Sequence, residues 1–329
     1  MVTVIVLIDQ IIWRPVIAWA EKFKFEQVEA AITPASPILN LLRRSRLLHF
    51  AGRFSVLPVR EALYLDFARR HAVRRQEAKK TTKPVAWLLL VCIAAGIAYA
   101  VVKMTIMVAG VSGPEVRSIF VGAGATFLRV EFVLLLATLW TVPVGVFLGL
   151  RPRISAVAQP ITQIAASVPA TALFPIILLV LIRLGGGLGI GSIVLLLLGT
   201  QWYILFNVIA GASAIPTDLK EVCDVYQLGR FERWRKLFLP AIFPYLVTGL
   251  VTASGGAWNA SIVAEYFHFQ GQTISTVGLG AVISQATDKG DFHVLLAATI
   301  LMAALVVTIN RLVWRRLYYL ASTKFRLEG

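Results

Sequence analysis

Residues 218–240, DLKEVCDVYQLGRFERWRKLFLP, determine how the rest of the sequence is interpreted. Nine of these twenty-three residues are charged, yet they separate two apolar stretches that are each long enough to cross a bilayer. Charged side chains are costly inside hydrocarbon, so this segment cannot be buried in lipid. It is therefore expected to lie at a membrane surface.

The pattern within this segment predicts two short amphipathic helices. Asp218 is placed to cap the first helix, and Gly229 ends it. The apolar residues of the first helix recur at helical spacing: Leu219, Val222, Cys223 and Tyr226. The second helix shows one apolar face, and Pro240 opens the next apolar stretch. That face consists of Phe231, Trp234 and Phe238. Such helices either lie in the headgroup layer or dock on a protein partner.

The spacing of the segment resembles the EAA loop of permease subunits of binding-protein-dependent ABC importers. In that loop a Glu leads a short coupling helix and a Leu-Pro pair closes it. Here Glu221 is followed by Leu239 and Pro240, with the proline nineteen residues after the Glu. The resemblance implies that the loop docks on a cytoplasmic ATPase. It also implies these coupling residues: Glu221, Tyr226, Gly229, Leu239 and Pro240.

The segment departs from the family pattern at three positions. Val222 and Cys223 replace the alanines that follow the Glu, and Gln227 stands where the family has a glycine. Gly229 comes two positions late, so these departures affect the bend between the two helices. The chain has no GxxxxGK[ST] phosphate loop, and ATP is expected to bind to partner subunits.

The composition is that of an integral membrane protein. Of the 329 residues 58% are hydrophobic and 15% are charged, which is too apolar for an ordinary soluble domain. The net charge of +15 belongs to basic residues beside apolar stretches, so it indicates membrane orientation and no nucleic-acid partner. Cys92 and Cys223 offer neither a disulfide framework nor metal-ligand spacing, and no metal or cofactor is expected.

Six apolar stretches predict an all-α membrane protein with six spans, a type I ABC importer transmembrane domain by the resemblance. The expected spans are about 85–108, 131–150, 165–184, 190–212, 241–265 and 291–313. This permease domain, residues 85–313, contains the polar loop 214–240 and precedes a tail at 314–329. A short external helix is expected over residues 275–288, where the family presents a surface to its solute-binding protein.

The distribution of Lys and Arg predicts the orientation. From Arg14 to Lys83 there are fifteen Lys and Arg against six Asp and Glu, so the linker 21–84 is expected in the cytoplasm. Six crossings then return the tail to the cytoplasm. With this layout 27 of the 32 Lys and Arg lie on the cytoplasmic side. The protein is expected in the cytoplasmic (inner) membrane.

Residues 1–20 are too short to span the hydrocarbon alone, but they resemble the end of the chain. When the sequence from Leu7 is aligned with the sequence from Val307, Trp13 and Arg14 match Trp314 and Arg315. The sequence also resembles duplicated permeases assigned to anion transport, in which two six-helix units are joined by a basic linker. The chain is then expected to hold the second unit, the linker and the last membrane helix of a preceding unit.

Polar side chains within the spans are candidates for a transport pathway, because each must face protein or water. In the fifth span Ser254, Ser261 and Glu265 share a helical face, and Asn259 lies on a neighbouring stripe. Gln201 is a further candidate from the preceding span. Two alternatives to a pathway stay open. The small residues of this span can serve helix packing, and Glu265 can lie at the outer water interface.

The resemblance implies a permease subunit that forms half of the path for a small oxyanion such as nitrate, a sulfonate or taurine. Its expected partners are two cytoplasmic ATPases, a second permease half or an identical subunit, a solute-binding protein and the bilayer. An ion-coupled secondary transporter is an alternative, although Glu131 and Glu265 are expected at span ends rather than centres. An integral membrane enzyme is less favoured, because no nucleophile and base share a helical face.

Overall fold

The computed structural model describes residues 87–269 and 271–325. The chain divides into two compact units, Met1–Val102 and Lys103–Gly329, and the second contains the elements discussed below. The helix Trp87–Ala109 crosses that boundary and, taken by itself, is long and apolar enough to span a membrane. The predicted remnant helix at 1–20, the linker at 21–84 and the last four residues of the tail lie outside the described residues.

Four further segments of the described residues pass as single membrane-crossing helices. Two are the uninterrupted helices α6 (Gly113–Gly149) and α9 (Leu188–Ser213). The third joins α11 (Arg230–Arg233), the π-helical turn η4 (Trp234–Phe238) and α12 (Leu239–Ala264) into 35 residues. The fourth joins α14 (Phe292–Ile309), η5 (Asn310–Trp314) and α15 (Arg315–Lys324) into 33 residues.

The predicted second and third spans differ from the observed helices. The second begins at Gly113 rather than near residue 131, which places Glu131 in the middle of α6 and not at a span end. The third is a bent pair, α7 (Pro152–Ser167) and α8 (Ala170–Arg183), with 78° between its halves. Pro169 causes the break, because a residue that precedes proline is driven from the helical to the extended conformation, as Val168 is here.

Helix α9 packs against both α6 and α12 and forms the centre of this unit. Buried apolar side chains from the three helices share one core, among them Val133, Ile204 and Ile242. Small residues bring the helices close: a Cβ added at Gly149 would lie 2.6 Å from the backbone oxygen of Ile209. Such contacts replace hydrophobic burial as the source of helix association in a bilayer.

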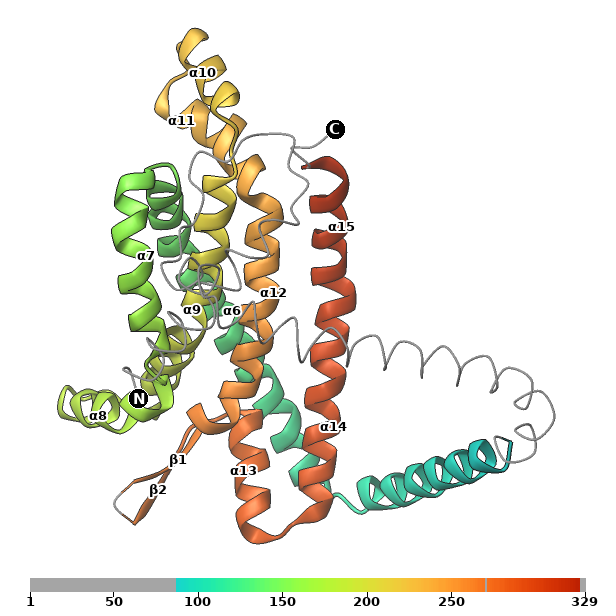
Figure 1. The fold of residues 1–329 in the computed structure, drawn as a ribbon. Coiled ribbons are helices and arrows are strands. Elements are labelled where there is room, and N and C mark those ends of the chain that lie inside the picture. The colour runs from blue at the N-terminus through green and yellow to red at the C-terminus, as the bar shows by residue number, and fades with distance from the viewer. Residues whose placement is uncertain (1–86, 270, 326–329) are drawn as a thin grey trace, which may run out of the picture. The chain divides into compact units, whose positions relative to one another are not determined.

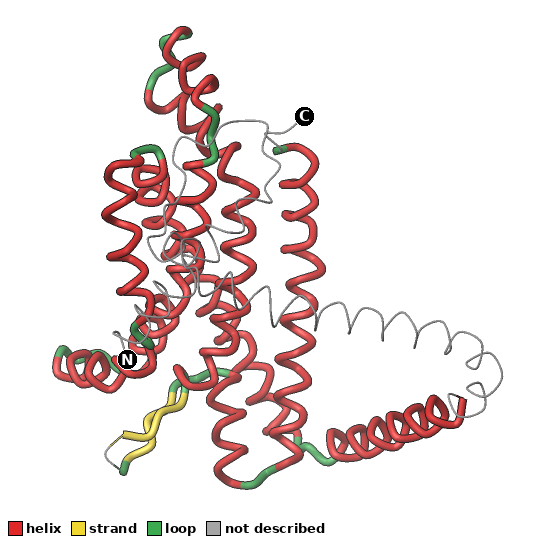
Figure 2. Tube along the Cα trace, in the orientation of Figure 1, coloured by secondary structure: helices red, strands yellow, loops and turns green. Residues whose placement is uncertain are grey.

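The connections divide between two ends of this unit (Figure 1). One end carries α10 (Thr217–Val225), α11, the turn between α6 and α7, and the end of α15. The opposite end carries α13 (Leu279–Lys289) and an antiparallel hairpin of β1 (Tyr266–Phe269) and β2 (Gln272–Ser275). Figure 2 shows this hairpin as the only strand structure among the described residues. The loop at 214–240 and the segment at 275–288 therefore lie at opposite ends of the unit, as predicted.

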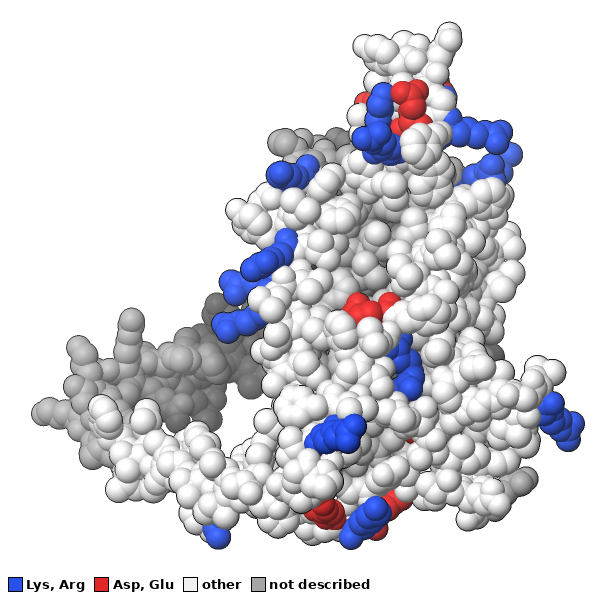
Figure 3. All heavy atoms as spheres, turned by 180° about the vertical axis from the view of Figure 1, so that it is seen from behind, with Lys and Arg blue, Asp and Glu red and all other residues white. Residues whose placement is uncertain are grey.

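The predicted external helix at 275–288 begins later than expected. Its first residue, Ser275, is the last residue of β2, and α13 starts at Leu279 after the extended Gly278. The hairpin was not predicted, although the turn residue Gly271 has the positive φ of 76° that favours glycine. Charged side chains are sparse over the body and gather on the protruding α10–α11 segment (Figure 3).

Candidate coupling loop and pathway face

Helix α10 begins at Thr217, directly after Pro216. Proline is well suited to a helix start because its φ is already close to the helical value, and Pro216 has φ −57°. Asp218 therefore lies inside the first turn, and no side-chain capping bond is formed, so its predicted capping role is wrong. Glu221 is exposed in the second turn.

The bend after α10 is formed by Gln227 and not by Gly229. Gln227 has φ 49°, in the left-handed region, whereas Gly229 has φ −63° and precedes α11. The backbone N–H of Leu228 bonds the oxygen of Cys223, and that of Gln227 bonds the oxygen of Asp224, both at 3.0 Å. This is the Schellman pattern of helix termination. The bend thus occurs at the position where the family has its glycine, and the prediction that Gly229 ends the helix is wrong.

Two contacts fix α10 against α11. A guanidinium nitrogen of Arg233 lies 2.7 Å from a carboxylate oxygen of Asp224, and the Arg233 Nε–H donates to the backbone oxygen of Leu228 at 2.9 Å. The carboxylate of Glu232 accepts bonds from the Gly229 N–H and from Lys236 Nζ. These contacts hold the two halves of the loop together.

The apolar side chains of this loop divide into an inner and an outer set. Cys223 and Leu237 are buried, and Trp234 and Phe238 form an edge-to-face pair against the core. Five others are exposed on the protruding segment and are called the coupling surface: Leu219, Val222, Val225, Tyr226 and Phe231. The side chains predicted to share one apolar face of each helix therefore differ in burial. The sequence analysis did not include Val225 among the apolar residues of the loop. Which side chains of α10 are exposed depends on how the helix packs against the core, and the sequence does not show this.

Leu239 and Pro240 lie in the second half of the loop, inside a continuous helix. The Leu239 N–H bonds the oxygen of Trp234, five residues back, in the π-helical turn η4. A π turn before a proline absorbs the hydrogen bond that the proline ring nitrogen cannot donate. The prediction that Pro240 opens a new segment is therefore wrong, because the helix continues through this residue. The second half of the loop, α11 and η4, forms one continuous helix with α12, here called the rod.

The predicted pathway residues separate into buried and exposed positions. Ser254, Ser261 and Glu265 share a face, as predicted, and that face is buried. Gln201 on α9 is also buried. Asn259 is exposed, and its amide has no partner among the described residues.

An exposed polar stripe runs along α12. It consists of Thr248, Thr252 and Asn259, which recur at helical spacing. The two threonine hydroxyls donate back to Pro244 and Thr248 oxygens. A polar stripe on a membrane-spanning helix is expected to face protein or water and not lipid.

Glu265 directly follows the last residue of α12, and its side chain is fully buried in protein and does not face water. Its carboxylate accepts bonds from the Thr126 hydroxyl at 2.7 and 2.9 Å, from the Gly280 N–H at 2.8 Å, and from the guanidinium of Arg129. Arg129 also donates to the backbone oxygen of Val277. These contacts, here called the Glu265 cluster, join α6, α12 and the start of α13.

Comparison with known proteins agrees with this architecture. The sequence model of the family described as binding-protein-dependent transport system inner membrane component matches residues 141–324. A nitrate import permease protein of Leptolyngbya laminosa is 28% identical over 60% of this chain and 67% of its own length. A bicarbonate transport system permease protein of Synechococcus elongatus is 28% identical over 57% and 65%. A taurine transport system permease protein of Escherichia coli is 24% identical over 63% and 70%.

The chain spans about two thirds of the length of these curated relatives. Among solved structures, inward-facing MetNI methionine ABC transporter chains share the fold. One matches with a TM-score of 0.53 at 22% identity, over 64% of this chain and 99% of its own. More than half of the chain matches the family sequence model, and the fold agrees. The chain belongs to the family of binding-protein-dependent transport system inner membrane components.

Proposed function

We propose that this chain is a permease subunit of an ATP-driven importer and forms half of the path for a small oxyanion. The observation that carries the proposal is the coupling surface, an exposed apolar cluster on a charged, protruding loop. Exposed apolar clusters of this kind mark interaction sites. The relatives named for nitrate, bicarbonate and taurine support an anionic substrate.

The partner proposed for the coupling surface is a cytoplasmic ATPase, one of two. Glu221 and Tyr226 are both exposed on the loop, and Tyr226 is 74% exposed, so an ATPase groove can enclose them. The Asp224–Arg233 ion pair holds α10 to α11, and α11 continues without a break into α12. Movement of the ATPases would therefore be transmitted to the whole rod, from the loop to the Glu265 cluster.

The second half of the path is proposed to come from another permease unit, either an identical chain or a related one. A single unit of this fold presents its polar stripe on one side only, so a channel needs a facing partner. Asn259 is the pathway residue that the geometry favours, because its amide is exposed and unpartnered among the described residues. The opposite end, with α13 and the hairpin, is the proposed surface for a solute-binding protein.

The orientation that this proposal requires places the coupling loop, the linker and the tail in the cytoplasm of a cell with an inner membrane. The concentration of Lys and Arg in these segments supports that side.

The coupling proposal is tested by substituting one residue of the coupling surface and one matched residue outside it. Tyr226→Ala is expected to lower co-purification of the ATPase and ATP-dependent uptake at least tenfold. Tyr319→Ala, which removes a 70% exposed tyrosine from α15 at the same end, is expected to leave both unchanged. Equal effects of the two substitutions would contradict the proposal. It would also be contradicted if the chain co-purified with no ATPase and the Glu221→Arg variant kept full uptake.

An ion-coupled secondary transporter stays the second candidate, and one observation favours it. Glu131 is half-buried in the middle of α6, and a secondary transporter can bind its coupling ion at an acidic side chain in the middle of the membrane. Membrane vesicles distinguish the two. Uptake that continues without ATP, stops with a proton uncoupler and is lost in Glu131→Gln would support ion coupling.

A further inference from the structure

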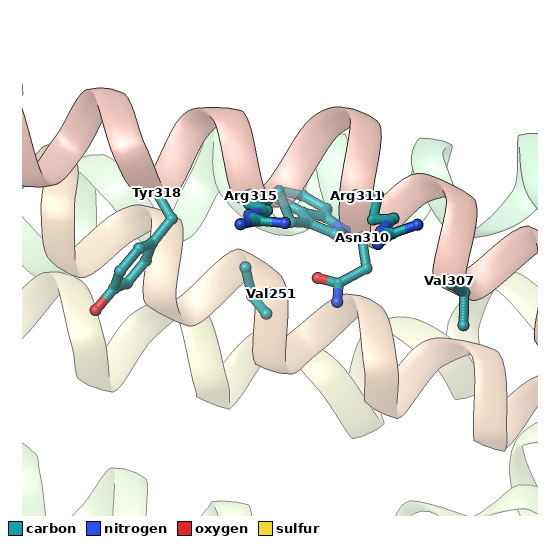
Figure 4. A pocket seen from close by; sticks show the side chains of 7 residues that line it. Val251, Val307, Asn310, Arg311, Arg315 and Tyr318 are labelled. Carbon is teal, nitrogen blue, oxygen red and sulfur yellow. The ribbon is translucent and has the colours of Figure 1, made fainter.

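A hollow of about 500 Å³ lies between α12 and the helix formed by α14, η5 and α15 (Figure 4). Val251 contributes from α12. The other side is formed by Val307, Asn310, Arg311, Arg315 and Tyr318, together with Trp314. Their spacing of three or four residues places them on one face of one helix. The hollow is remote in sequence from the coupling loop and does not include the polar stripe.

Within residues 87–269 and 271–325, the two guanidinium groups of this hollow have no carboxylate partner. Arg311 and Arg315 are exposed, one helical turn apart, and form no ion pair or hydrogen bond among the described residues. The Asn310 amide and the Tyr318 hydroxyl likewise have no partner in the described part of the chain. Four polar groups therefore line this hollow, and two of them are positively charged, which suits a phosphate.

The depth of the hollow in the bilayer indicates where that phosphate comes from. Arg311 is nineteen residues after Phe292, so at 1.5 Å per residue it lies about 28 Å along the helix. The hydrocarbon is about 30 Å thick, so Arg311 reaches its far edge and Arg315 lies at headgroup level. Trp314 and Tyr318 are the aromatic residues typical of that boundary.

The order of side chains along the helix matches one lipid molecule. Val307, 58% exposed, lies on the side of the membrane centre, where an acyl chain would run. Asn310 and Arg311 follow at the level of the ester groups and phosphate, and Arg315 and Tyr318 lie beyond. A free inorganic anion would use the cationic end and leave the apolar end uncovered.

We infer that Asn310 and Arg311 bind the phosphate of an anionic phospholipid in the leaflet nearest the coupling loop, and that Arg315 and Tyr318 lie beside the rest of its headgroup. The lipid fills the space between α12 and α14–η5–α15, so it holds the last helix against the rod that carries the loop. This inference requires membrane insertion of the chain and is independent of which solute is transported.

The full chain in neutral detergent tests this inference. Its unfolding midpoint is measured with short-chain phosphatidylglycerol, with phosphatidylcholine of the same chain length, and with inorganic phosphate. Phosphatidylglycerol is expected to raise the midpoint in a saturable manner, and the other two are not. Since each Arg near an anionic headgroup contributes about 1 kcal/mol, the double substitution Arg311→Gln, Arg315→Gln should weaken phosphatidylglycerol binding about thirtyfold.

Arg316→Gln is the matched control, because Arg316 is exposed on the same helix but does not line the hollow. It is expected to bind phosphatidylglycerol as the unmodified chain does. Equal loss in the control and the double variant would show general attraction of basic residues to anionic lipid, and would overturn the site. Stabilisation by inorganic phosphate to the same extent would overturn the lipid as the ligand. The headgroup comparison on the unmodified chain remains decisive if the double variant does not fold.

Discussion

The guanidinium of Arg129 on α6 pairs with the carboxylate of Glu265, 136 residues later at the end of α12. The Glu265 side chain is 0% exposed and that of Arg129 is 11% exposed, so both charges have left water. Thr126 strengthens the arrangement, because its hydroxyl donates to Glu265 and accepts the N–H of Leu279 at 2.8 Å. The ion pair joins the two spans, and the N–H groups of Leu279 and Gly280 hold the start of α13 to Thr126 and Glu265.

Removal of one partner of this pair should be strongly destabilising. Glu265→Ala leaves the guanidinium of Arg129 without its counter-charge, and breaking a buried pair in this way typically costs about 3–5 kcal/mol. The double substitution Arg129→Met, Glu265→Leu removes both charges and is expected to recover most of the loss. Unfolding midpoints of the detergent-solubilised chains measure both effects.

Glu115→Ala is the control for that experiment, because the half-buried side chain of Glu115 has one hydrogen-bond partner among the described residues, the Ser112 N–H at the start of α6. Its loss is expected to lower stability by about 1 kcal/mol. A double variant as unstable as Glu265→Ala alone would show that the ion pair is not the source of the loss.

The left-handed bend at Gln227 predicts a stabilising substitution. A non-glycine residue at φ 49° pays about 1 kcal/mol of steric cost that glycine avoids, so Gln227→Gly should stabilise the loop by up to that amount. Gln227→Val should destabilise it, because a β-branched residue is poorly tolerated there. Hydrogen exchange of the α10 amides is the measurement.

Gly229→Ala is the comparison at the neighbouring glycine. Gly229 has a negative φ, and its added Cβ would meet only the Glu232 carboxylate at 4.0 Å, so little change is expected. Equal behaviour of Gln227→Gly and Gly229→Ala would contradict the assignment of the bend to Gln227.

The sequence was sufficient to predict the helical membrane fold, because bilayer thickness imposes a length on apolar segments. The family was predicted from the resemblance of the loop with Glu221, Leu239 and Pro240. The sequence failed where a charge is neutralised by a distant residue. Arg129 and Glu131 interrupt the hydropathy of α6, so the span was started at 131, and only the packing of Glu265 against Arg129 shows why the helix extends further. The left-handed Gln227 was likewise unpredictable, since no local rule favours glutamine there.

The tie between the hairpin and α13 should depend on pH. The Tyr266 hydroxyl donates to Asp288 at 2.6 Å, and this bond, followed by one from His268, holds the pKa of Asp288 below its ordinary value. A carboxyl with a lowered folded-state pKa stabilises above its unfolded pKa, and that contribution is lost as the pH falls through the folded-state pKa. The contribution should therefore be present at neutral pH and disappear in acid.

Comparison with Asp288→Asn isolates this carboxyl. The unfolding midpoint of the unmodified chain should exceed that of Asp288→Asn near neutral pH, and the two should converge below the lowered pKa of Asp288. A difference that stays constant across the acidic range would show that ionisation of Asp288 does not contribute.

The polar stripe on α12 predicts that Asn259 faces water in the assembled transporter. After Cys92 and Cys223 are replaced by serine, Asn259→Cys in membranes is expected to react with a charged thiol reagent, because the path it lines admits ions. Leu139→Cys is the control, since Leu139 is apolar, 73% exposed and on α6, and is expected to face lipid. A thiol in hydrocarbon is not ionised and is shielded from the reagent, so its reaction should be at least tenfold slower.

Addition of the transported anion should slow the reaction at position 259 and leave that at 139 unchanged. Equal rates at the two positions would mean that the stripe faces lipid, and the half-path assigned to α12 would then have to lie on another helix.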